Sequence, residues 1–109
     1  MSEPMSGEHR LDDVIQHPTR LTVMAFLSGA LEAEFGAVRD YAEISDASVS
    51  RIVSALQEAG YVNVRKGYVG KRPRTWLSLT PQGRDALAGH LEALRAIAET
   101  ARQAAAGPG

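Results

Sequence analysis

The stretch from Ser45 to Gly60 constrains the fold most, because it predicts one amphipathic helix with two very different faces. Apolar residues recur along it at helical spacing and predict a buried stripe, namely Val49, Ile52, Val53, Leu56 and Ala59. The other face carries short side chains and one long cation, namely Ala47, Ser48, Ser50, Arg51 and Ser54. A face of such small residues lets a helix come close to another surface.

This small-residue face has two interpretations, and the helix alone does not choose between them. In the first, the face packs against another helix of the same domain. In the second, it approaches DNA, because serine and arginine side chains can contact both base edges and phosphates. The residues before and after the helix are therefore needed to distinguish the two interpretations.

The residues that precede this helix predict a flexible start and a core helix. Residues 1–9 are polar and predict a tail, and residues 11–16 predict a short helix. Pro18 suits a first helical turn, so a core helix is expected from there to about Leu31. The residues expected on its buried side are Leu21, Met24, Ala25, Leu27 and Leu31.

A second helix is expected between the core helix and the opening stretch. Phe35 lies in a short extended link and is predicted to be a buried anchor. The helix then covers about residues 37–43, with inward residues Val38, Tyr41 and Ala42. Ser45 is a suitable N-cap for the following helix, so the two helices with their short turn predict a helix-turn-helix.

Two stretches of alternating hydrophobicity follow and predict a β-hairpin. They cover residues 61–65 and 74–79, and a loop is expected at residues 66–73. Five cations and no acid occur within residues 65–74, namely Arg65, Lys66, Lys71, Arg72 and Arg74. Five neighbouring cations repel one another unless an anionic partner is present, so this loop favours contact with phosphates.

The distribution of charge supports an anionic partner, although the formal net charge is only -1. Residues 1–50 hold three basic and nine acidic side chains, whereas residues 51–84 hold seven basic and one acidic side chain. A basic middle segment in a nearly neutral chain indicates a local anionic surface as its partner. Together with the hairpin, this segment favours the DNA interpretation of the opening helix.

The last helix, expected from Pro81 to about Ala104, carries a heptad-like seam of Leu87, Leu91, Leu94, Ala98 and Ala101. The alternative is that this seam packs back on its own domain. Little core remains past the hairpin to bury it, so the seam favours a homodimer. The dimer interface is expected to include Leu11, Val14 and Ile15 as well.

At this point the chain resembles the winged helix-turn-helix regulators of the MarR/ArsR type, and most closely a small single-domain subgroup of bacterial transcriptional regulators. The matching pieces are His17-Pro18, Arg20-Leu21, Phe35, Ser45-Asp46, Val49-Ser50-Arg51, Leu56-Gln57-Glu58-Ala59-Gly60-Tyr61-Val62, Gly70-Lys71-Arg72-Pro73-Arg74-Thr75 and Leu79-Thr80-Pro81-Gln82-Gly83-Arg84. Together they span roughly residues 10 to 98. The chain departs from the usual pattern at Val49 and Ile52, where members often have Leu and His.

The resemblance implies an α+β fold with a three-helix core, a β-hairpin wing and a long C-terminal dimerisation helix. It implies that the second helix of the motif enters the major groove through Ser45, Ala47, Ser48, Ser50, Arg51 and Ser54. It also implies that the wing contacts DNA through Lys66, Lys71, Arg72 and Arg74. Asp46 is excluded from this set, because its charge suits the helix N-terminus and would repel phosphate. The expected organisation is a tail at 1–9, the DNA-binding domain at 10–80, the dimerisation helix at 81–105 and a frayed end at 106–109.

Other classes of protein find little support. The chain has no cysteine, no apolar run long enough to span a bilayer and no secretory signal, which favours a cytoplasmic protein. No nucleophile–base pair or glycine-rich phosphate loop suggests an enzyme, and no cofactor is expected. A metal site that combines His90 with Asp85 or Glu92 is conceivable, but a structural role for His90 is favoured without cysteine or a nearby second histidine.

The sequence thus predicts a homodimeric regulator that binds double-stranded DNA, acts as a repressor and has no membrane partner. The alternatives are a winged helix that serves as a protein-interaction module, and a dimer that senses a small-molecule effector between the core and last helices. The sequence specifies neither the DNA site nor an effector.

Overall fold

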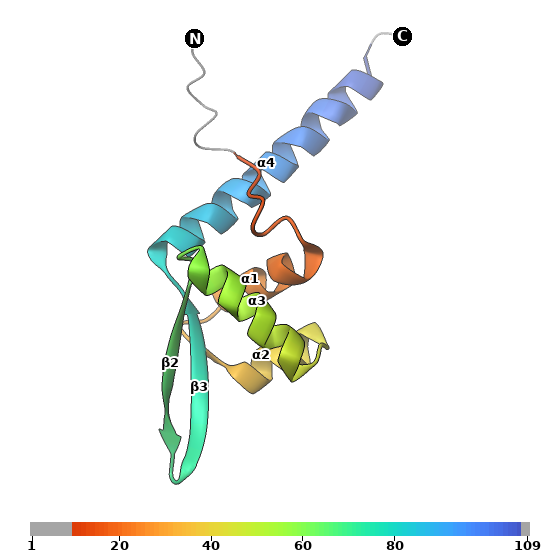
Figure 1. Cartoon of the computed structure of the whole chain (residues 1–109). Coiled ribbons are helices and arrows are strands. Elements are labelled where there is room, and N and C mark those ends of the chain that lie inside the picture. Colours follow the sequence, from red (N-terminus) through yellow and green to blue (C-terminus); the bar gives the residue numbers. More distant parts are fainter. Residues whose placement is uncertain (1–9, 108–109) are drawn as a thin grey trace.

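In the computed structural model, the described residues 10–107 form four helices and a three-stranded antiparallel sheet (Figure 1). The helices are α1 (Pro18–Ser28), α2 (Phe35–Ala42), α3 (Asp46–Glu58) and α4 (Pro81–Ala105). The strands are β1 (Ala33–Glu34), β2 (Val62–Val69) and β3 (Arg72–Leu79), in the spatial order β1-β3-β2. The predicted α+β winged helix-turn-helix is confirmed, while the tail expected at residues 1–9 lies outside the described residues.

One core joins the helix-turn-helix to the sheet. The apolar stripe of α3 is buried through Val49, Val53 and Leu56, and Ile52 packs at its edge. The other fully buried large apolar side chains are Ile15, Val23, Met24, Leu27, Val38 and Leu77. Their burial fixes α3 on α2 and on the base of the hairpin, so the opposite face of α3 points outward.

Both ends of α3 are set by local interactions, and the sequence predicted the one at Ser45. The hydroxyl of Ser45 accepts the backbone N–H of Ser48, which satisfies a donor of the first helical turn. At the other end Gly60 has a φ of 83°, and the N–H of Tyr61 reaches back to the carbonyl of Leu56. This arrangement is a Schellman motif, which favours glycine because an L side chain is strained at positive φ.

Four expectations for the first 45 residues were wrong. Residues 11–16 form a turn and no helix, because the carboxylate of Asp12 accepts the N–H groups of Val14 and Ile15. Leu31 is 89% exposed, since α1 ends at Ser28 and does not reach it. Two further residues expected inside are exposed, namely Ala25 and Tyr41, and the Tyr41 ring stacks on Phe26.

The hairpin is longer and its turn tighter than expected. The pairing of β2 with β3 continues to Val69 opposite Arg72, so Gly70 and Lys71 alone form the turn. Gly70 has a φ of 64°, which suits the first position of a two-residue hairpin turn. Gly67 is not a turn residue, because it lies within β2 opposite Arg74, and a Cβ there would lie 3.2 Å from the Trp76 ring. It leaves room for that ring within the strand.

A polar network ties the N-terminal segment to α4 and to the start of the hairpin. His90 is 1% exposed, and its Nδ1 atom accepts the backbone N–H of Asp12 at 2.9 Å. The hydroxyl of Tyr61 donates to the carboxylate of Asp12. His90 therefore takes part in the packing of α4 against the N-terminal segment. Among residues 10–107, no group of three or more histidine, cysteine, aspartate or glutamate side chains could hold a metal ion.

The start of α4 packs against the junction of α3 and β2. Thr80 caps this helix by accepting the N–H of Gly83 at 2.8 Å, and its own hydroxyl donates to the Gly60 carbonyl. Gly83 is buried so closely that a Cβ would collide with the Tyr61 carbonyl oxygen and lie 3.0 Å from Tyr61 Cα. Within residues 10–107, no helix has the length and apolar character needed to cross a membrane.

We expect Gly83→Ala to lower the free energy of unfolding by about 2–3 kcal/mol, because the added methyl group must displace backbone atoms. Urea denaturation measures the loss. Gly29→Ala is the control, since a Cβ there is 3.6 Å from its nearest neighbour. That variant should keep its stability or gain up to about 1 kcal/mol. Equal stability of the two variants would contradict this packing.

Tyr61 should ionise late in an alkaline titration. Burial and the hydrogen bond to Asp12 raise the pKa of Tyr61 from 10.0 to about 12. The folded state therefore favours the neutral phenol, and this stabilisation is present below pH 10 and lost as the pH rises to about 12. Tyrosinate absorbance should show this late step, and Tyr61→Phe should remove it. A Tyr61→Phe titration identical to that of the native protein would disprove the assignment.

Candidate nucleic-acid interface

The outward face of α3 presents the small residues that the sequence predicted for DNA contact. Ala47, Ser50 and Ser54 are exposed and lie three and four residues apart, on one side of the helix. Ser50 and Ser54 make no side-chain hydrogen bond within residues 10–107. Their hydroxyl groups are therefore available to an external donor or acceptor.

The remaining predicted contacts on α3 belong to a short network at its N-terminal end. The Ser45 hydroxyl donates to the Ser48 hydroxyl at 3.0 Å, and Arg51 donates to Ser48 at 3.2 Å. Asp46 forms an ion pair with Arg39 of α2 at 3.1 Å. Hydrogen bonds to Asp40 and, second, to Asp46 raise the pKa of Arg39. The ion pair neutralises the carboxylate that would otherwise repel a phosphate.

A groove of about 590 Å³ separates α3 from the hairpin. Its polar lining comes from both sides, namely Ser50, Ser54, Gln57, Lys66 and Thr75. Its apolar floor consists of Phe35, Val53, Val64 and Leu77. Gln57 and Thr75 were not predicted as contacts. Gln57 could have been found, because it continues the spacing of Ser50 and Ser54 along α3.

A second hollow, of about 500 Å³, lies along the other side of the same helix face. Its lining is Arg20, Ser50, Arg51, Ser54, Ala55 and Glu58. The guanidinium of Arg20 donates to the Val14 carbonyl at 3.0 Å, so α1 places a second cation beside Arg51. Arg20 was not among the predicted contacts, because nothing in the sequence shows that α1 passes beside α3.

The hairpin distributes its cations over two faces. Residues that lie opposite each other in the pairing share a face, and successive residues alternate. Lys66 lies on the face that looks toward α3, together with Val64. Arg65, Arg72 and Arg74 lie on the far face, and Lys71 lies in the turn.

Two of the five hairpin cations have acidic partners, which the sequence did not reveal. Arg65 donates two hydrogen bonds of 2.8 Å to Glu32 and lies 4.1 Å from the centre of the Trp76 ring. The bonds to Glu32 raise the pKa of Arg65, and those from Arg65 lower the pKa of Glu32. Arg74 lies 3.3 Å from Glu34.

The predicted wing contacts therefore differ in how available they are. Lys66, Lys71 and Arg72 are exposed and have no acidic partner within residues 10–107. Arg74 is only partly exposed and is held by Glu34 at the base of the wing. The unneutralised positive charge thus lies at the tip of the hairpin and along its α3 side.

The predicted dimer residues also separate into two groups. Ile15 and Leu87 are buried in the protomer's own core and cannot contact a partner, and Val14 packs beside them. The other members of the predicted interface are exposed, namely Leu11, Leu91, Leu94, Ala98 and Ala101. Ile97, which lies outside the heptad seam and was not predicted, is exposed on the same part of α4.

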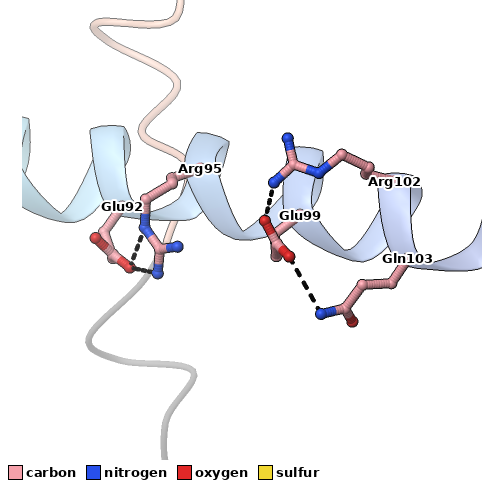
Figure 2. A network of polar contacts seen from close by, with 5 residues as sticks. All are labelled: Glu92, Arg95, Glu99, Arg102 and Gln103. Atoms are coloured by element: carbon pink, nitrogen blue, oxygen red, sulfur yellow. Dashed lines mark hydrogen bonds and ion pairs between the residues drawn. The ribbon is translucent and has the colours of Figure 1, made fainter.

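The free half of α4 is amphipathic. Figure 2 shows the polar contacts of Glu92 with Arg95, of Glu99 with Arg102, and of Gln103 with Glu99, all along one side of the helix. By helical spacing, the exposed apolar residues lie on a different side. Figure 1 shows this half of the helix extending beyond the rest of the fold. The apolar stripe formed by Leu91, Leu94, Ile97, Ala98 and Ala101 is therefore left exposed by the rest of residues 10–107.

Structures with the same arrangement are known. A transcriptional regulator homologue from Pyrococcus horikoshii OT3 superposes with a TM-score of 0.75 at 24% identity, covering 80% of this chain and 86% of that one. BpsR from Bordetella bronchiseptica, whose DNA binding is regulated by 6-hydroxynicotinic acid, gives 0.67 at 18% identity over 83% and 67%. A MarR family regulator from Silicibacter pomeroyi gives 0.61 at 23% identity over 83% and 60%, so the chain spans less than two thirds of that protein.

The sequence itself matches the model of a protein family over most of its length. Residues 19–98 match the family described as winged helix DNA-binding domain. No curated protein matches the chain. The matched range includes α3 and both strands of the hairpin, which form the candidate interface. The chain therefore belongs to the winged helix DNA-binding domain family, with the fold of a MarR-type regulator.

Proposed function

We propose that the protein is a sequence-specific regulator of transcription that binds double-stranded DNA as a homodimer and acts as a repressor in the cytoplasm. The observation that carries this proposal is that Lys66 lies beside the small-residue face of α3, while Lys71 and Arg72 stay unneutralised at the tip of the same hairpin. That face lies next to a groove that Lys66 also lines. A helix of small polar residues beside a cationic hairpin fits the surface of a duplex. The cations can contact its phosphates, and the helix can come close enough to contact base edges in a groove.

The two parts of this surface have different proposed roles. On α3, Ser50, Ser54 and Arg51 are proposed to contact base edges and nearby phosphates in the major groove. Ala47 gives the close approach, and the N-terminal network of Ser45 and Ser48 orients Arg51. The wing supplies most of the electrostatic affinity through Lys66, Lys71 and Arg72, while Arg74 contributes less because Glu34 holds it.

The homodimer is supported by the uncovered apolar stripe of α4, together with Leu11. Apolar residues that repeat over three helical turns on a protruding helix are costly to leave in water. Two copies that pack these stripes together would place their α3 helices for two half-sites about 34–36 Å apart on one face of the duplex. Such a dimer would exclude polymerase from a promoter, which is the basis of the proposed repression.

The direct test is selection of bound duplexes from a random DNA pool, followed by affinity measurement at several salt concentrations. The function requires an enriched sequence with two related half-sites. A promoter that contains this sequence should be transcribed less in vitro when the protein is added. A folded dimer that shifts no DNA at low salt would refute DNA binding and would favour a protein-interaction module.

Single substitutions of wing cations should change the salt dependence of binding. Each cation that contacts a phosphate releases about one counterion, so Lys71→Ala or Arg72→Ala should reduce the slope of log affinity against log salt by about 1. Fluorescence anisotropy of a labelled duplex measures this slope. Arg102→Ala is the matched control, because it removes the same charge from α4, and it should leave the slope unchanged.

Substitutions in the α4 stripe should separate the dimer. Leu94→Arg with Ile97→Arg places two charges in the proposed interface, and the protein should then behave as a monomer in light scattering coupled to size exclusion. Gln103→Arg is the control, because it introduces the same charge on the polar side of α4 and should leave the dimer intact. A dimer that survives the double substitution would show that the stripe is not the interface.

A further inference from the structure

The tip of the hairpin exposes an aromatic ring that none of the roles above uses. Tyr68 is 72% exposed, and it makes no hydrogen bond or ring contact within residues 10–107. Its neighbour Val69 is 54% exposed. The fold does not need either side chain in its core, so the ring is free to contact a partner.

The pairing of the strands shows which way the ring points. Tyr68 lies opposite Pro73, two residues beyond Lys66 and on the same face of the hairpin. Lys66 lines the groove beside α3, so Tyr68 extends the wall of that groove toward the tip. Val69 lies opposite Arg72 and therefore belongs to the other face.

The charges around the ring identify the chemistry of its partner. Lys66 and Lys71 lie on either side of Tyr68 in the sequence, and neither has an acidic partner within residues 10–107. A surface that combines unneutralised cations with one exposed ring suits a partner that has anionic and apolar parts close together. The sugar–phosphate backbone of DNA has this character, because each phosphate is flanked by deoxyribose groups.

We propose that Tyr68 is a DNA contact, whose ring packs against deoxyribose on the strand that passes between α3 and the wing. The inference rests on the proposed function, because it assumes that α3 and the wing occupy neighbouring grooves of one duplex. A strand between two grooves must then cross the space lined by Ser54 and Lys66. Tyr68 lies along the same wall, where it meets sugars rather than base edges.

This contact predicts a thermodynamic signature that differs from that of the wing cations. Packing of an uncharged ring displaces no counterions, so its loss weakens binding by the same factor at every salt concentration. It carries no information about base sequence, so the loss is equal on selected and unrelated duplexes. A lysine contact would instead change the slope of the salt dependence.

The experiment compares three variants of the full chain by anisotropy on the selected duplex and on an unrelated duplex. Tyr68→Ala should weaken binding to both duplexes about tenfold without changing the salt slope, because the apolar surface of the ring is no longer removed from water. Tyr68→Phe keeps the ring and should bind within about twofold of the native protein. Val69→Ala removes a similarly exposed side chain from the other face and should leave affinity unchanged. Circular dichroism should confirm that all three variants are folded.

Each other outcome overturns the proposal in a distinct way. Native affinity in Tyr68→Ala shows that the ring makes no contact. Equal losses in Tyr68→Phe and Tyr68→Ala show that the hydroxyl group, and not ring packing, is responsible. Equal losses in Val69→Ala and Tyr68→Ala show a general effect of the hairpin tip. Failure of the native protein to bind any duplex removes the proposed function as well, whereas the other three outcomes leave that function standing.

Discussion

The contact between Gly83 and the backbone of Tyr61 is the constraint on which the rest of the structure depends. It brings the first turn of α4 against the point where α3 ends and β2 begins, and the Thr80 N–H donates to the Tyr61 carbonyl there at 3.0 Å. From this point the Tyr61 hydroxyl donates a hydrogen bond to the Asp12 carboxylate, and the backbone N–H of Asp12 donates one to His90. The ends of three elements and the N-terminal segment are thus fixed within one small region. The orientation of α3 relative to the wing follows from it.

The electrostatic character of the surface results from pairing as much as from composition. Glu32 and Glu34 come from the segment at β1, and they neutralise the two arginines that lie near the base of the wing. Such exposed ion pairs contribute little to stability, but they remove positive charge from one region and leave it in another. The hairpin cations without an acidic partner in residues 10–107 are Lys71 and Arg72 at the tip and Lys66 beside α3. Two glutamates of the acidic first half of the chain therefore neutralise part of the basic hairpin and leave its remaining positive charge at the tip and on the α3 side.

The sequence predicted those features that depend on neighbouring residues. The N-cap at Ser45 and the apolar stripe of α3 follow from local rules, so α2, α3 and α4 were placed almost correctly, whereas no helix forms at residues 11–16. It could not predict contacts between distant residues, such as that of Glu32 with Arg65. Leu31 was misplaced because its burial depended on where α1 stops. The turn of the hairpin was predicted to be too long, because a glycine such as Gly67 is typical of a turn. In the structure Gly67 instead leaves space for the Trp76 ring within the strand.

The continuity of α4 has a mechanical consequence. One uninterrupted helix of 25 residues begins at the Tyr61 junction and ends beyond the apolar stripe. It is about 38 Å long, so a rotation of about 5° at one end moves the other end by about 3 Å. That displacement is close to the rise of a single base pair, roughly 3.4 Å. In the proposed homodimer, a slight tilt of α4 would therefore shift the two α3 helices relative to each other along the DNA.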